Sequence, residues 1–236
     1  MKILILSSYT GKKKYEPDNC IRFEDLEPPA HLENRIRELS GYSAPAGEMF
    51  TGPLHTQLRH GLKQIRKHAQ YSENTLDLYF PWYGFRVDGQ KIPVNENDHI
   101  VPFNITPRRP LRPLEYNETG FLESMGTLIE GYDLVLSILR WNDIVLLQRV
   151  FEVERKATLI FLIAPSHRHV VDDSLSNVHI VEAGTNLSRA IGAMNVALNG
   201  VVLRRLCEAA YRDGFQVFEK IKQDPQRLIE IVLRGR

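Results

Sequence analysis

Cysteine is scarce in this chain, which has only Cys20 and Cys207 among its 236 residues. The two lie far apart and form no CxxC pair, so a disulfide scaffold and a cysteine-built zinc site are not expected. Long apolar runs are also missing: the longest, residues 157–165, is far shorter than the ~20 residues that a membrane-spanning helix needs. We therefore expect no membrane span. Since the chain begins directly with the strand-like KILIL and has no signal-peptide pattern, we expect a cytoplasmic protein.

An excess of charge of one sign is absent, because 30 Lys and Arg stand against 29 Asp and Glu. This balance argues against a uniformly basic surface but is compatible with a local basic patch. Several familiar site motifs are absent as well, namely the Walker loop GxxxxGK[ST], GxGxxG, GxSxG and HExxH. His167 and His169 form an HxH pair without a third ligand nearby in the sequence. We therefore expect no metal and no cofactor.

Five short apolar runs, bounded by turn residues, predict strands at residues 3–8, 76–81, 132–139, 159–164 and 178–181. Most of these runs are continuous, which is typical of strands that are covered on both faces. Helical periodicity occupies residues 53–71, and a long helix is expected to open at 184–186 and to continue through Met194 to Val202. The alternation predicts an α/β fold with a mainly parallel central sheet flanked by helices.

Two proline-rich stretches, residues 15–50 and 89–113, predict irregular excursions from this plan, the first with a helical piece at 31–39. The main domain is expected to span residues 1–212, and a helical extension residues 213–236. Asp224 and Pro225 predict the start of a last helix that ends at Gly235. The extension can pack on the domain, or it can form a homodimer or bind a partner protein.

In an open parallel sheet, ligands bind outside the carboxyl ends of the strands. Here those ends are rich in hydroxyls, glycines and both tryptophans, which suits phosphate, carboxylate or a stacked base. The alternative is that these are the ordinary turn residues of any α/β protein. The candidate ligand-binding residues are Ser7, Ser8, Thr10, Gly11, Lys12, Thr51, Trp82, Gly84, Ser166, Gly184 and Thr185. Thr51 in addition precedes a predicted helix, so it is either an N-cap or an anion contact.

Two groups of cations are candidate nucleic-acid contacts. The first lies along the helix predicted at 53–71, opposite its leucines, and the second lies in the proline-rich loop. The alternative for the helix is a solvated outer face, whereas arginines on a proline-stiffened loop suit phosphate recognition. The residues are Arg59, Lys63, Arg66 and Lys67 on the helix, and Arg108, Arg109 and Arg112 in the loop.

Asp98 and Tyr83 are the candidate catalytic residues. Asp98 stands in Asp-x-Ile-x-Pro-Phe, where it either supplies a carboxylate for acid–base or sugar-hydroxyl contact or caps a turn before Pro102. Tyr83 follows the second predicted strand beside Gly84. It either stacks on or donates to a base, or belongs to the core.

The string SSYTGKKK at residues 7–14, followed by APAGEMFTG at 44–52, resembles the opening of a small bacterial and phage family. Members of that family begin with a strand and SC-x-x-KKK and continue with PA-x-x-[LM]-YTG. The likeness continues through LYFPWYGF at 78–85, DHIVPFN at 98–104 and NVHIVEAG at 177–184. The family is similar to the peroxide-stress YaaA-like superfamily and, more remotely, to archaeosine synthase and its transglycosylase relatives.

The resemblance implies a YaaA-like α/β domain that works on a nucleotide or nucleic acid. It implies DNA association through the peroxide-stress relatives and base modification through the remoter ones. This chain departs from the family at Ser8, which replaces the usual cysteine and argues against thiol chemistry, and at Phe80-Pro81-Trp82, which replaces a small Ser-Ala pair and reshapes the pocket.

The sequence therefore leaves three functions open. The first is an enzyme that acts at an N-glycosidic bond, either a glycosidase or a base-exchanging transferase. Ser8, Thr10 and Lys12 would hold phosphate or sugar, Tyr83 the base, and Asp98 would supply the carboxylate. The second is a non-catalytic DNA-binding protein of stress-response or phage-defence type that uses the basic helix and the arginine loop. The third is a structural subunit that dimerises through its carboxyl-terminal helices.

Overall fold

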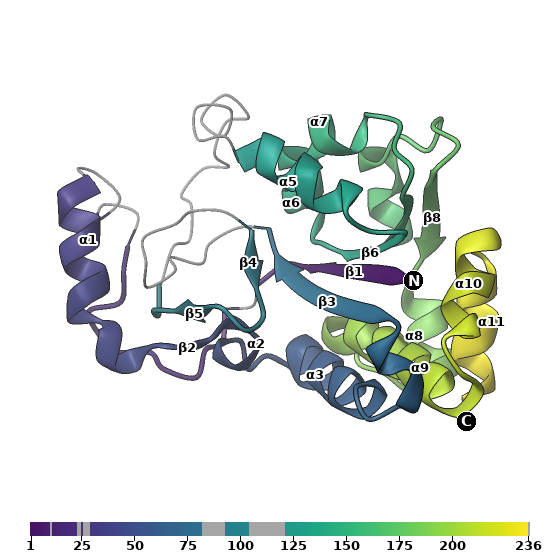
Figure 1. Ribbon diagram of the computed structural model, residues 1–236, viewed down its shortest axis with the longest axis horizontal. Coiled ribbons are helices and arrows are strands. Elements are labelled where there is room, and N and C mark those ends of the chain that lie inside the picture. The colour runs from purple at the N-terminus through teal and green to yellow at the C-terminus, as the bar shows by residue number, and fades with distance from the viewer. Residues whose placement is uncertain (10, 23–24, 26–28, 82–92, 104–120, 236) are drawn as a thin grey trace.

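A computed structural model describes residues 1–9, 11–22, 25, 29–81, 93–103 and 121–235, without the side chains of 29 and 121. At its centre lies a six-stranded sheet in the order β4-β3-β1-β6-β7-β8 (Figure 1). All neighbouring pairs are parallel except β3 and β4. The strands are β1 (Lys2–Ser7), β3 (Thr75–Phe80), β4 (Val94–Asn95), β6 (Leu134–Ile138), β7 (Thr158–Ile163) and β8 (Val178–Glu182). The predicted α/β class with a mainly parallel sheet is thereby confirmed.

The five predicted strands are the five parallel strands of this sheet. Their apolar runs are continuous because both faces are covered: alternate side chains of β1 and β6 enter two separate hydrophobic clusters. Ile3 and Ile5 belong to one cluster, while Leu4 and Leu6 belong to the other. The sequence pattern did not predict β4, since two residues are too short to show a period.

Helices cover both faces of the sheet (Figure 1). One face packs against the helices that contribute to the larger hydrophobic cluster, and the other against those of the smaller cluster. The first group is α3 (Pro53–Ile65), α8 (Thr185–Ile191), α9 (Leu198–Asp213), α10 (Gln216–Gln223) and α11 (Arg227–Arg234), and the two helices between residues 29 and 49 add to the same cluster. The second group is α5 (Phe121–Glu130), α6 (Trp141–Leu146) and α7 (Gln148–Phe151).

Two glycines bring α3 and α9 into main-chain contact. A Cβ atom at Gly200 of α9 would lie 2.3 Å from the carbonyl oxygen of Leu54, and one at Gly61 of α3 would lie 2.8 Å from the Cα of Arg204. Neither position has room for a side chain, because the obstacle in each case is main chain. The close approach fixes α3 against α9 along its length, from Leu54 to Gly61.

The single long helix predicted after residue 184 is wrong. Instead, α8 ends at Gly192, whose φ of 67° is left-handed, and α9 begins six residues later, at Leu198. The 3₁₀ helix η5 (Asn195–Ala197) lies between them. Met194, which the helical period places inward, is 67% exposed. The left-handed residue turns the chain, so the period before the break does not continue across it.

The first proline-rich excursion contains α1 (Pro29–Glu38), close to the predicted helical piece, and then η2 (Ser40–Tyr42) and α2 (Ala46–Met49). Its strand β2 (Ala44–Pro45) pairs with β5 (His99–Ile100) in a two-stranded antiparallel sheet. This small sheet lies at the side of the domain beyond β4 (Figure 1). Much of the second excursion, residues 104–113 included, falls outside the described residues.

The carboxyl-terminal helices pack on the main core. Val217, Phe218 and Ile221 of α10, with Leu228 and Val232 of α11, are buried in the same hydrophobic cluster as α3 and α9. Helix α11 begins at Arg227, two residues after Pro225, and the Asp224 carboxylate accepts the N–H of Gln226. The segment 213–236, predicted as an extension, therefore shares its core with the rest of the chain.

Candidate functional site

The carboxyl end of β1 meets the start of α6 through a buried serine and a buried carboxylate. The hydroxyl of Ser8 donates to Oδ2 of Asp143, and its oxygen accepts the N–H of Arg140 at 2.7 Å. Arg140 Nε also lies 3.4 Å from the same carboxylate oxygen. Ser8 and Asp143 are only 6% and 7% exposed. The carboxylate is therefore held in place by a hydroxyl and a guanidinium at the edge of the sheet.

The turn after β6 explains this arrangement. Strand β6 ends at Ile138, α6 begins at Trp141, and the N–H of Asp143 donates to the carbonyl oxygen of Arg140 at 2.9 Å. An acidic residue is favoured in the first turn of a helix, where free N–H groups carry partial positive charge. The neighbouring strand end supplies Ser8. The site thus follows from the parallel pairing of β1 with β6.

An aromatic wall runs beside the serine–carboxylate pair. The guanidinium of Arg140 lies 4.7 Å from the ring centroid of Tyr9, and Tyr9 packs edge-on against Phe103 at 5.8 Å. The ammonium of Lys13 lies 5.3 Å from the centroid of Phe103. Two cations therefore rest on neighbouring aromatic rings, in a geometry that stabilises positive charge.

Ser7 faces the opposite side of the sheet and contacts α3. Its Oγ lies 3.1 Å from Nε2 of His55 and donates to the carbonyl oxygen of Ser8 at 3.1 Å. Burial, with a smaller contribution from the charge of Arg59, lowers the pKa of His55 to about 3. Ser7 and His55 are closed to solvent. This pair therefore attaches α3 to β1 and is not placed to meet a substrate.

The loop after β1 runs beside the residues that precede α3. The N–H of Thr51 donates to the carbonyl oxygen of Lys12 at 3.0 Å, and the N–H of Lys14 donates to that of Met49 at 2.8 Å. The predicted ligand residues Gly11, Lys12 and Thr51 are thus brought together next to Ser7 and Ser8. Within the described part of the chain, the buried Oγ1 of Thr51 has no hydrogen-bond partner.

The ends of β7 and β8 continue the same rim. A Cβ at Gly184 would lie 2.9 Å from the Pro165 ring, so Gly184 permits close packing of α8 on η4 (Pro165–Val170). The indole of Trp141 stacks on His167 of η4, with ring centroids 5.8 Å apart. Ser166 and Thr185 are exposed nearby in sequence. The contacts therefore link the predicted strand ends from Ser8 through residues 140 and 141 to η4.

Asp98 lies elsewhere, in the turn between β4 and β5. Its Oδ2 accepts the N–H of Asn95 at 2.8 Å, and its carbonyl oxygen accepts that of Ala46 at 2.9 Å. Because β4 is antiparallel to β3, the chain from Val94 to Asp98 leads away from the carboxyl edge. The carboxylate thus has the turn-closing role that was one of the two predicted alternatives, although the turn is not the one before Pro102.

Seven of the predicted site residues fall outside the described residues. They are Thr10, Trp82, Tyr83, Gly84, Arg108, Arg109 and Arg112.

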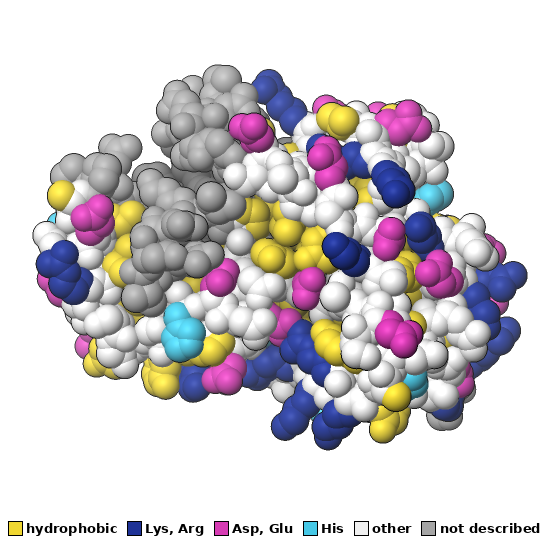
Figure 2. All heavy atoms as spheres, viewed as in Figure 1, with side chains coloured by type: hydrophobic (Ala, Val, Ile, Leu, Met, Phe, Trp, Pro, Cys, Tyr) yellow, Lys and Arg dark blue, Asp and Glu magenta, His cyan; other side chains and the backbone are white. Residues whose placement is uncertain are grey.

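The predicted basic face lies partly on α3 and partly in the turn that follows it, because the helix ends at Ile65 and not at residue 71. Figure 2 shows Lys and Arg side chains gathered over the region that α3 occupies in Figure 1. Lys63 and Lys67 are exposed and Arg59 is half-buried. Arg66 differs, because both of its terminal nitrogens bind the carboxylate of Glu96, whose side chain is 9% exposed. The guanidinium of Arg66 is thereby paired with a carboxylate of the fold. The basic face consists of the other three cations, Arg59, Lys63 and Lys67.

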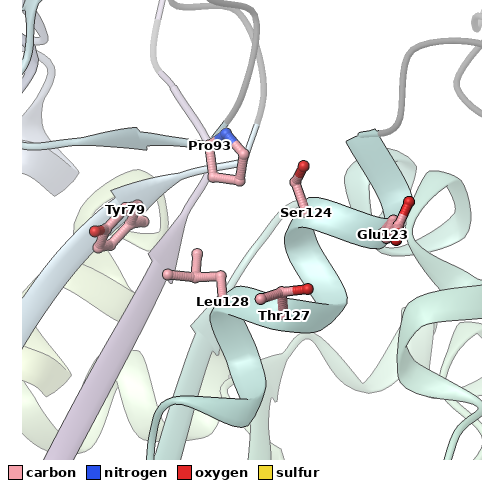
Figure 3. A pocket seen from close by; sticks show the side chains of 6 residues that line it. All are labelled: Tyr79, Pro93, Glu123, Ser124, Thr127 and Leu128. Atoms are coloured by element: carbon pink, nitrogen blue, oxygen red, sulfur yellow. The ribbon is translucent and has the colours of Figure 1, made fainter.

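A hollow of ≈ 460 Å³ lies between β3 and α5, on the sheet face that packs against α6 (Figure 3). Its apolar walls come from Tyr79, Pro93 and Leu128, and its polar groups from α5, namely Glu123, Ser124 and Thr127. The sequence pattern singled out none of these residues. Helical spacing puts Ser124, Thr127 and Leu128 on one side of α5, but only the fold places that side beside β3.

The sequence analysis also did not predict Asp143 as a site residue, and it gave Arg140 no role beyond its place at a strand end. The available signal was position, because Asp143 is one turn of helix beyond the end of the third predicted strand. Over the described ranges, no three His, Cys, Asp or Glu side chains are grouped so that they could hold a metal ion. Over the same ranges, no helix has the length and apolar character to cross a bilayer.

No family model, curated protein or solved structure matches this chain. The YaaA-like resemblance thus stays a prediction from sequence motifs, and the function has to be argued from the geometry of the strand-end site.

Proposed function

We propose that this protein is a nucleotide- or nucleic-acid-directed enzyme that acts at an N-glycosidic bond, as a glycosidase or a base-exchanging transferase. The observation that carries the proposal is the buried Asp143 carboxylate, held by Ser8 and Arg140 beside the aromatic wall. Asp143 takes the role that the sequence pattern gave to Asp98, because the Asp98 carboxylate closes the β4–β5 turn.

The chemistry of the bond suits this set of groups. When an N-glycosidic bond breaks, positive charge develops on the sugar while the base leaves with the bonding electrons. A carboxylate already fixed by hydrogen bonds stabilises that charge without reorganising at the moment of reaction. Water then completes hydrolysis at the sugar carbon, or a second base completes an exchange. Asp143 would supply the carboxylate in either case.

The surrounding groups suit the rest of a nucleotide. The exposed indole of Trp141 offers a flat surface for a base. Arg140 contacts both members of the pair and can meet a phosphate, and the exposed Lys12 lies four residues beyond Ser8 in the loop after β1. The resemblance to the YaaA-like superfamily and its transglycosylase relatives supports the same substrate class.

The test compares Asp143→Asn with Asp98→Asn. Base release from nucleosides, nucleotides and DNA is measured, together with melting temperature and ligand affinity. Because Asn can still accept the Ser8 hydrogen bond, Asp143→Asn should lower turnover by about 10²–10³ while affinity changes only a few-fold. Asp98→Asn should keep wild-type turnover. Wild-type protein that releases no base from any of these substrates, or Asp143→Asn with full turnover, would refute the proposal.

A second function, non-catalytic DNA binding, is favoured by the basic face, which is formed by Arg59 and Lys63 of α3 and by Lys67 of the turn after it. Contacts with several phosphates give binding that weakens steeply with salt. The variant Lys63→Glu with Lys67→Glu should then bind DNA more weakly and with a shallower salt dependence. Lys220→Glu with Lys222→Glu on α10 makes the same change in net charge and serves as the control. Equal DNA binding by the two double variants would show that the basic face is only exposed to solvent and does not contact DNA.

A further inference from the structure

The hollow between β3 and α5 has three apolar walls that border one space. Tyr79 belongs to β3, the buried Pro93 directly precedes β4, and Leu128 reaches toward them from α5 (Figure 3). The volume of ≈ 460 Å³ lies within the ~300–1,000 Å³ that small-ligand sites occupy. The hollow therefore has the size and the apolar surface to receive a small flat ring.

The polar groups that α5 adds to the hollow include no cation. They are the carboxylate of Glu123 and the hydroxyls of Ser124 and Thr127. The other acid of this helix, Glu130, is paired with Arg155 at 2.5 Å. Among the described residues, no Lys, Arg or His lies within ion-pair distance of Glu123, and none lines the hollow. The hollow therefore suits a ligand that donates hydrogen bonds and carries no negative charge.

A hydrogen bond beside the hollow holds the end of α5 to β3. Tyr132, two residues after α5 ends, donates its hydroxyl to Oδ2 of Asp77 at 2.8 Å. Asp77 and Tyr79 are two residues apart on β3, so their side chains lie on the same face of the sheet. Burial, together with this hydrogen bond, raises the pKa of Tyr132, and the hydroxyl therefore stays a donor at neutral pH. The gap between β3 and α5 is thus fixed without a ligand, and a second carboxylate lies beside it.

The strand register places the hollow on the same sheet face as the serine–carboxylate pair. Tyr79 pairs with Leu6 of β1, two residues before Ser8. Tyr79 and Leu6 both pack in the smaller hydrophobic cluster, against which α6 with Asp143 also packs. Trp141 follows β6, the other neighbour of β1. The hollow and the indole of Trp141 therefore lie on opposite sides of β1.

We propose that the hollow binds a free nucleobase that carries an amino group. The flat ring would pack between Tyr79, Pro93 and Leu128, and its amino N–H would donate to the Glu123 carboxylate. The identity of this ligand rests on the proposed function, because a free base is the product of hydrolysis at an N-glycosidic bond and the second substrate of an exchange. The acidic lining suits the free base better than a nucleotide, whose phosphate would meet no cation among the described lining residues.

Isothermal titration calorimetry with adenine and cytosine tests the proposal. Thr127 is exposed at the wall of the hollow, so Thr127→Trp fills the space without disturbing the core. Thr127→Ala leaves the space open and is the matched control. We expect wild type and Thr127→Ala to bind adenine with affinities equal within about twofold, and Thr127→Trp to bind it about tenfold more weakly or less.

A second pair of variants tests the contact with Glu123. Glu123→Ala removes a charged acceptor and should weaken adenine binding by about tenfold. Glu219→Ala on α10 makes the same change in charge at an exposed position away from the hollow and should leave adenine binding unchanged. Purine has the ring system of adenine without the amino group, so its affinity should be the same for Glu123→Ala and wild type. An equal loss of affinity for purine and adenine would overturn the amino contact.

Two outcomes overturn the inference as a whole: folded wild-type protein that binds neither adenine nor cytosine, or wild-type affinity for both in Thr127→Trp. Melting temperatures establish that each variant is folded. The result is also separable from the proposed function. Base release from a substrate by a protein that binds no free base overturns the hollow alone. Adenine binding that Thr127→Trp removes, without base release from any substrate, overturns the glycosidic reaction and leaves the base site.

Discussion

Replacing Gly200 with alanine tests how tightly α3 is fixed against α9. The added Cβ would lie 2.3 Å from the carbonyl oxygen of Leu54 and 2.9 Å from its carbonyl carbon. Non-bonded heavy atoms pack at roughly 3.5–4 Å, so the two helices must separate by about 1 Å. No rotamer change relieves this contact, because every atom involved belongs to the main chain or to the Cβ itself.

The expected loss of stability follows from two opposing effects. Overpacking a core contact costs about 1–3 kcal/mol, and a clash between two helix backbones belongs at the upper end of that range. Alanine recovers about 1 kcal/mol because it favours the helix more than glycine does. The net loss is about 2 kcal/mol, which for a chain of this size lowers the melting temperature by about 4–8 °C.

Scanning calorimetry of Gly200→Ala and of a matched variant, Gly126→Ala, measures this effect. Gly126 is also inside a helix, but a Cβ there would meet only the guanidinium end of the Arg155 side chain, 3.0 Å away, and no main chain outside its own helix. Gly126→Ala should therefore be as stable as wild type or up to about 1 kcal/mol more stable. If Gly200→Ala melts at the wild-type temperature, the contact between α3 and α9 has room for the added Cβ, and the predicted loss of stability is refuted.

Two further predictions concern buried polar groups. The folded protein keeps His55 neutral down to about pH 3, whereas the unfolded chain protonates it below about pH 6.5; unfolding free energy should therefore fall by about 1.4 kcal/mol per pH unit as pH drops through this window. Urea unfolding at a series of pH values should show that the unfolding free energy of His55→Gln depends less steeply on pH than that of wild type. Arg66→Met leaves the carboxylate of Glu96 unpaired and should cost about 2–3 kcal/mol in urea unfolding, less than a fully buried pair because Arg66 is partly exposed. Adding Glu96→Met should recover most of that loss; if it recovers none, the ion pair is not the cause.

The parallel sheet could be predicted because its strands are buried on both faces. Continuous apolar runs separated by helical segments have few alternatives to an α/β sheet. The break between α8 and α9 could not be predicted in the same way. In the sequence, apolar residues keep a helical spacing across Gly192, but in the structure the left-handed φ of this glycine turns the chain and leaves Met194 exposed.

The candidate site was predictable by position more than by residue role. The rule that ligands bind at carboxyl strand ends selected Ser8, which holds Asp143, and Lys12, which lies beside Thr51, but it also selected Ser7, which is buried against His55. It did not select Asp143, because no period or motif marks a lone acid one turn into a helix. The role of Asp98 depends on the antiparallel pairing of the two-residue strand β4. Pairing over so short a length is determined by tertiary contacts that the sequence pattern does not contain.

The serine at position 8 fits a carboxylate site better than the cysteine that is usual in the resembling family. A thiolate at this position would lie against the Asp143 carboxylate, and two like charges at hydrogen-bond distance raise the pKa of the thiol. A hydroxyl stays neutral, donates to the carboxylate and still accepts the N–H of Arg140. At this site Ser8 therefore positions Asp143 and has no need to act as a nucleophile, and the nucleophilic role is left to water or to a second base.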